Sequence, residues 1–141
     1  MTHNFTLLLL VCFWGTSAMA QSPVGIWKNL DDTDGREKSH IEITERNGTL
    51  TGKVIKLLPA ATITKCDACK GANKGKHIEG MTILWDLKKN GNTWDNGQIL
   101  DPKSGKIYSC KVEFESDDVL KVRGFLGISL LGRTQTWYRV K

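Results

Sequence analysis

Residues 39–57 read SHIEITERNGTLTGKVIKL, and this stretch decides the fold. Ile41 and Ile43 alternate with polar residues, which is the period-two pattern of a strand with one buried face. Asn47-Gly48 follows, and both positions tolerate the positive φ of a two-residue hairpin turn. The stretch therefore predicts two antiparallel strands, over residues 39–46 and 49–57.

The same combination of short strand and tight turn recurs along the chain. Strands are predicted at residues 24–30, 39–46, 49–57, 82–88, 93–100, 106–114, 119–125 and 134–140. No segment has a convincing amphipathic helical period. Strands in such close succession favour an all-β, antiparallel, up-and-down barrel of eight strands. The alternative is an open sandwich of two sheets, and we favour the barrel because closure removes exposed edge strands.

One connection between predicted strands is much longer than the others. Residues 58–80, between the third and fourth predicted strands, show no clear period. Loops of this length in small domains serve as lids or binding loops, or are disordered.

The N-terminus has the composition of a secretory signal. Residues 1–20 contain no Asp, Glu, Lys or Arg, residues 5–14 are almost entirely apolar, and Ala18-Met19-Ala20 fits a signal-peptidase site. The apolar run is shorter than the roughly 20 residues that span a bilayer, so a membrane anchor is disfavoured. We expect cleavage after Ala20, one β-barrel domain over residues 21–141, and a periplasmic or secreted location.

The chain has 141 residues and a formal net charge of +5. This length suits one domain, and the mild positive charge favours anionic surfaces slightly. The sequence has no dense Arg-rich stripe with interleaved aromatic residues, so we expect no nucleic-acid partner. No stretch after the signal is long and apolar enough to predict a transmembrane segment.

The first and the last predicted strands carry residues that can contact each other. Gly25-Ile26-Trp27 lies on the first strand and Arg139 on the last, and these strands are neighbours in a closed barrel. An Arg stacked on a Trp stabilises by about 0.5–2 kcal/mol. Arg133 is the alternative partner for Trp27. This pattern resembles the G-x-W motif and late Arg of the lipocalins and wider calycins, in which the pair is structural.

Two further stretches are more specific. Residues 101–108 read DPKSGKIY and residues 122–137 read VRGFLGISLLGRTQTW. Together with G-x-W they resemble the domain of unknown function (DUF) family 2147, a family of small exported bacterial proteins. The resemblance covers essentially the whole chain after the signal. It implies a lipocalin-like barrel, export and no assigned enzymatic activity.

The cysteines after the signal are Cys66, Cys69 and Cys110. In an oxidising compartment a Cys66–Cys69 disulfide would tighten the long loop, while Cys110 would stay buried as a small apolar residue. A bridge from the loop to Cys110 is the alternative. The three cysteines and His77 form a possible zinc set, but only one C-x-x-C unit is present, so we expect no metal.

Residues 124–132 form an apolar connection with three glycines, between the last two strands. Such a segment can plug one end of a barrel, line a portal or contact a partner, and an exposed apolar loop is a liability unless it is used.

Enzyme signatures are missing from the sequence. It has no G-x-S-x-G, no H-E-x-x-H and no phosphate-binding loop, so we expect neither an enzyme nor a cofactor. The acidic stretch from Asp31 to Asp34 lacks the remaining ligands of a calcium loop and is interpreted as a solvated turn.

Four of the five tryptophans fall in predicted strands, and aromatic-lined pockets suit apolar ligands. We therefore expect an exported binding protein for a small apolar or amphipathic molecule. The residues predicted to line the barrel interior are Trp27, Ile41, Ile43, Trp85, Trp94, Tyr108 and Val112. The alternative is a structural or interaction protein of the envelope, with a filled core, that acts through residues 124–132.

Overall fold

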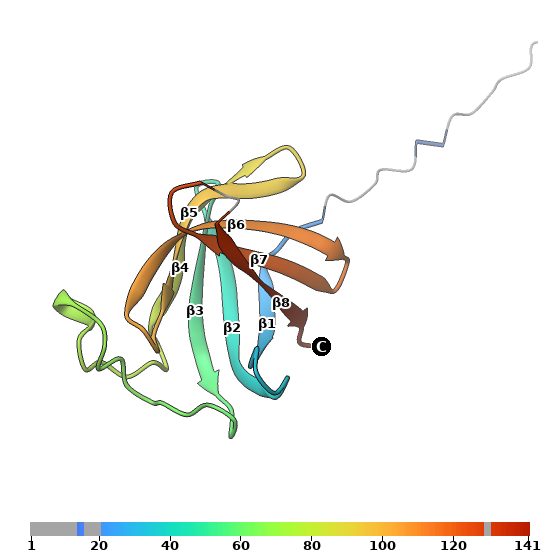
Figure 1. The fold of residues 1–141 in the computed structure, drawn as a ribbon. Helices are drawn as coiled ribbons and strands as arrows, with labels where there is room; N and C mark the ends of the chain where they lie inside the picture. Colours follow the sequence, from blue (N-terminus) through green and yellow to red (C-terminus); the bar gives the residue numbers. More distant parts are fainter. Residues whose placement is uncertain (1–13, 16–20, 129–130) are drawn as a thin grey trace, which may run out of the picture.

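Eight antiparallel strands form a closed barrel in which each strand pairs with the next and the last pairs with the first (Figure 1). The structure is a computed structural model that describes residues 14–15, 21–128 and 131–141. The strands are β1 (Gly25–Leu30), β2 (Glu37–Arg46), β3 (Thr49–Leu57), β4 (Thr82–Asn90), β5 (Thr93–Asp101), β6 (Lys106–Ser116), β7 (Val119–Phe125) and β8 (Gly132–Arg139). A short 3-10 turn, η1 (Gly71–Asn73), lies in the β3–β4 connection. The predicted all-β up-and-down barrel is therefore confirmed.

Local turn chemistry explains how the strands follow one another. Asn47 and Gly48 adopt φ values of 52° and 76° between β2 and β3. A two-residue turn with two positive φ angles matches the right-handed twist of the strands on either side. The hairpin predicted from the Asn-Gly pair is therefore present.

The barrel closes where β1 meets β8. Trp27 pairs with Arg139 across these strands, and the guanidinium carbon of Arg139 lies 4.3 Å from the centre of the Trp27 ring. Gly25 suits this position because its φ is 145°, which L side chains rarely adopt, and because a Cβ would lie 2.8 Å from a guanidinium nitrogen of the stacked Arg139. Arg133 pairs instead with Asp32, at 2.7 Å. Arg139 is thus the residue that stacks on Trp27.

Part of the interior is filled. Trp27, Ile41, Ile43 and Val112 are completely buried. Phe114 connects the aromatic side chains there, because its ring centre lies 6.2 Å from that of Trp27 and 5.8 Å from that of Trp94.

Trp85 departs from the predicted alternation along β4. The completely buried residues of this strand are Leu84 and Leu87, whereas Trp85 is half-buried and donates its indole N–H to Gln98 Oε1 at 3.0 Å. Asp86, between Trp85 and Leu87, has a φ of 61°, and this irregularity interrupts the period of two along the strand. Trp85 is therefore only partly buried, although it packs against the hydrophobic core.

The predicted signal peptide, residues 1–20, lies outside the described residues except at Trp14 and Gly15. Within the part of the chain that the structure describes, no helix is long and apolar enough to cross a membrane.

We expect Arg139→Lys to lower the free energy of unfolding by about 1–2 kcal/mol, because a lysine keeps the charge but loses the planar fork that stacks and donates several hydrogen bonds. Urea unfolding measures this change. Arg133→Lys is the matched control and should shift stability by less than about 0.5 kcal/mol, since its ion pair is exposed. Equal losses in the two variants would contradict the role given to Arg139.

Candidate functional site

The segment before β1 lies against one end of the barrel. Pro23 is buried, and its carbonyl oxygen accepts the indole N–H of Trp27 at 2.8 Å. Arg139 donates to the carbonyl oxygens of Val24, at 3.2 Å, and Asp117, at 3.3 Å. This end is therefore occupied by packed side chains and by the segment that crosses it.

A cavity of about 410 Å³ lies at the opposite end, where the β1–β2, β5–β6 and β7–β8 connections surround the mouth of the barrel. We call this space the mouth cavity. Its apolar walls include Ile83, Ile99, Val122 and Trp137. Its polar lining includes Asn29, Tyr108 and Gln135. Apolar walls with a few placed polar groups are typical of small-molecule sites.

Hydrogen bonds fix the amide side chains in this cavity. Trp137 donates its indole N–H to Gln135 Oε1 at 3.2 Å, and Gln135 Nε2 donates to Asp32 at 3.4 Å. On the neighbouring strands, Ser39 donates its hydroxyl to Asn29 Oδ1 at 2.6 Å. The polar groups are therefore oriented before any ligand arrives, and both apolar and polar parts of one molecule can be accommodated.

Four of the charged side chains at the rim of the mouth cavity form ion pairs. Arg133 contacts Asp32 at 2.7 Å, and Lys38 lies 3.7 Å from Asp31. The backbone N–H of Thr33 donates to Asp31 and holds the pKa of that carboxyl below its ordinary value. These pairs are exposed and add little stability, but they leave the rim with little net charge.

Of the seven residues predicted to contact a ligand, the structure places Tyr108 in the mouth cavity. The others belong to the packed part of the interior or, for Trp85, to the strand face where it meets Gln98. Trp137, Gln135 and Val122 were missed. For Trp137 and Gln135 the signal was present, since Arg139 pairs with Trp27 and alternate residues of β8 share its side of the strand. Val122 lies on β7, paired with Gln135.

The β3–β4 connection packs on the β5–β6 turn. Gly105 has a φ of 70°, and a Cβ at this position would lie only 2.0 Å from the carbonyl oxygen of Ala68. Cys66 Sγ lies 3.3 Å from the carbonyl oxygen of Pro102. The long loop is thus seated on the barrel through close backbone contacts.

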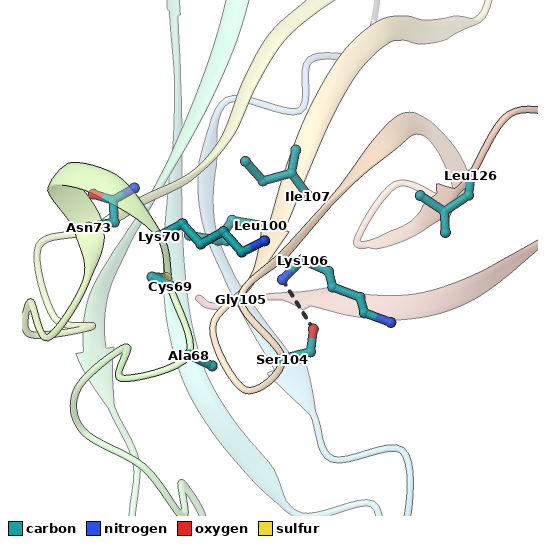
Figure 2. A pocket seen from close by; sticks show the side chains of 10 residues that line it. All are labelled: Ala68, Cys69, Lys70, Asn73, Leu100, Ser104, Gly105, Lys106, Ile107 and Leu126. Atoms are coloured by element: carbon teal, nitrogen blue, oxygen red, sulfur yellow. Dashed lines mark hydrogen bonds between the residues drawn. The ribbon is translucent and has the colours of Figure 1, made fainter.

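A second hollow, the outer cleft, lies where this loop meets the barrel. Figure 2 shows its lining, which comes from the loop, the β5–β6 hairpin and Leu126. Its volume is about 450 Å³. Lys70 extends from the loop over Leu100 toward the hairpin that carries Lys106. Leu126 also lines the mouth cavity, so the two hollows share one wall.

The cysteines divide into a bonded pair and a buried thiol. Cys66 and Cys69 form a disulfide, which confirms the predicted pair. Cys110 is free and buried, and burial raises its pKa to about 12. The alternative bridge from the loop to Cys110 is therefore not formed. Among the residues that the structure describes, no group of three or more metal-ligating side chains gathers at one point.

Comparisons with known proteins agree with this geometry. A family model described as "Uncharacterized protein conserved in bacteria (DUF2147)" matches residues 25–139. Among solved structures, the chain is similar to protein HP1028 from the human pathogen Helicobacter pylori, described as belonging to the lipocalin family, with a TM-score of 0.73 and 21% sequence identity. The match covers 84% of this chain and 82% of that protein, and it shows a shared fold. No curated protein matches the chain.

We expect the mature protein, residues 21–141, to react with no thiol reagent at neutral pH, because Cys110, the free thiol of that region, is buried and remains protonated. Denaturation should expose one reactive thiol, and denaturation with reduction should expose two more, since residues 21–141 contain three cysteines. Thiol titration measures each state. A thiol that reacts in the native state would contradict the burial of Cys110.

We expect Gly105→Ala to destabilise the protein by about 1–3 kcal/mol more than Gly91→Ala. Both glycines have positive φ, but a Cβ at Gly91 would meet open space while one at Gly105 would collide with Ala68. The difference in urea midpoints therefore isolates the contact between loop and turn. Equal midpoints would show that the loop does not rest on Gly105 in solution.

Proposed function

Because this chain belongs to the DUF2147 family of uncharacterized proteins conserved in bacteria, and its barrel is lipocalin-like, we propose that it binds a small apolar or amphipathic molecule without transforming it. The mouth cavity is the observation that supports this proposal. Its volume of about 410 Å³ falls in the lower part of the range of about 300–1,000 Å³ found for ligand pockets.

The lining of the mouth cavity favours a ligand with two unlike parts. Trp137, Ile99 and Val122 offer apolar contact area. Gln135 and Asn29 offer amide groups held in fixed orientations. A molecule with an apolar body and a small hydrogen-bonding group would satisfy both sets of contacts.

The two amide side chains that line this cavity, Asn29 and Gln135, suit binding rather than catalysis. Amides are neutral and do not act as nucleophiles or general bases. The nearby carboxylates are engaged, since Asp32 pairs with Arg133 and Asp101 accepts hydrogen bonds from the β5–β6 turn. The proposal therefore assigns no chemical step to the site.

We propose further that the protein acts outside the cytoplasm after cleavage following Ala20. The apolar run within residues 1–20 supports export. The Cys66–Cys69 disulfide supports an oxidising compartment, the periplasm or the exterior.

Native mass spectrometry of protein expressed with its own N-terminus and purified from the periplasm tests for a bound molecule. We expect added mass that leaves on denaturation. Because a ligand can be lost in purification, titration with the apolar fluorophore N-phenyl-1-naphthylamine provides the second measurement. We expect saturable fluorescence with one site per chain.

We expect Val122→Phe to weaken binding of the fluorophore at least tenfold, because the larger ring would fill part of the mouth cavity. Ile55→Phe is the matched control, since it adds a ring at an exposed position of β3 and should leave binding unchanged. Urea unfolding of both variants verifies that they are folded.

Absence of added mass together with absence of saturable fluorescence would overturn the binding proposal. That result would favour the alternative, an envelope interaction protein acting through residues 124–132. Loss of binding in both variants would show that the fluorophore binds outside the mouth cavity.

A further inference from the structure

Exposed apolar side chains gather beside the mouth of the barrel. Leu126 is 56% exposed, Ile128 61% and Leu131 68%, all in the β7–β8 connection. Ile107, on β6, is 49% exposed and lines the outer cleft together with Leu126. Leu126 and Leu131 also line the mouth cavity. We call these four side chains the apolar tip. Such a cluster on a small protein marks a contact surface.

Three cations flank the apolar tip. Lys70 comes from the long loop, and Lys103 and Lys106 come from the β5–β6 turn and the start of β6. All three are exposed, and among the described residues none lies within ion-pair distance of a carboxylate. Lys38 and Arg133, at the same end, already have acidic partners. In the same segments Asp101 and Asp67 also form no ion pair, so the three lysines leave a small excess of positive charge there.

The outer cleft brings both features together. Its lining contains Lys70 and Lys106, the apolar side chains of Leu100, Ile107 and Leu126, and no carboxylate (Figure 2). Lys70 follows the disulfide in the loop, which packs on the barrel at Gly105, and Lys106 begins β6 of the barrel itself. The fold therefore fixes the relative positions of the backbone at Lys70 and Lys106.

We propose that the open end of the barrel docks on a lipid surface that bears anionic headgroups. The apolar tip enters the boundary between headgroups and acyl chains, and Lys70, Lys103 and Lys106 contact the phosphates. Apolar residues ringed by unpaired cations are complementary to such a surface, where the negative potential attracts nearby lysines. The net charge of +5 adds attraction at longer range.

This proposal goes beyond ligand binding and does not depend on it. The mouth cavity would face the membrane in the docked state, since Leu126 and Leu131 belong both to the cavity and to the apolar tip. A protein with an empty or filled cavity would dock alike, so vesicle binding and fluorophore binding test separate claims.

Co-sedimentation of the purified protein with vesicles tests the proposal. One set of vesicles contains equal parts of phosphatidylglycerol and phosphatidylcholine, and the other contains phosphatidylcholine alone. We expect binding to the anionic vesicles that weakens as salt rises, because screening reduces the attraction of exposed charges. We expect much weaker binding to the neutral vesicles.

Two variants separate the cationic and apolar contributions. Replacing Lys70, Lys103 and Lys106 together by Ser should weaken binding to anionic vesicles on the order of a hundredfold, or about fivefold per charge. Its control replaces Arg46, Lys53 and Lys88 by Ser, which removes the same charge from exposed positions elsewhere. Leu126→Ser with Leu131→Ser should weaken binding by at least roughly tenfold, whereas Val24→Ser, at the other end, should not.

Absence of vesicle binding would overturn the proposal, as would equal binding to both kinds of vesicle. Equal losses in the Lys70/Lys103/Lys106 variant and in its control would also overturn it, because they would show that net charge alone drives the attraction. Urea unfolding of every variant verifies that a loss of binding does not follow from a loss of fold.

Discussion

A ring of antiparallel strands exists only if its first and last strands meet, and in this protein they meet through Trp27 and Arg139. The guanidinium lies over the indole and also donates to carbonyl oxygens of the segment before β1 and of the β6–β7 turn. One side chain therefore joins both strands and anchors the segment that crosses that end. This end is filled, and the mouth cavity lies at the opposite end of the barrel.

Much of the fold could be predicted because its signals are local. Asn47-Gly48 fixes a hairpin within two residues, and alternation in a single strand shows which residues share a face. Trp85 could not be placed in this way. The positive φ of Asp86 interrupts the alternation between Trp85 and Leu87, so these two residues do not share a face as the pattern predicted. No pattern of residue types within β4 announces such an irregularity.

The candidate site was harder to predict than the barrel. Alternation indicates that Ile41 and Trp137 both face inward, but it does not show which part of the interior is filled. That depends on which side chains meet across the ring, as Phe114 does with Trp27 and Trp94. The contact of Gly105 with Ala68 could not be predicted from the sequence either, because it joins a turn to a loop that has no periodic pattern of residue types. Alternation therefore predicts most of the inward-facing residues, whereas packing between strands determines where a cavity is left.

The pairing of β1 with β8 also sets the order in which the barrel can form during folding. Arg139 bonds to Val24 across 115 positions of the chain, so the contact that completes the barrel joins segments from its two extremes. Bringing distant segments together costs chain entropy before any contact repays it, which makes such topologies slow to fold. During synthesis β8 is the last strand to be made. The ring therefore closes only after β8 has been made, and until then β1 lacks its second neighbour.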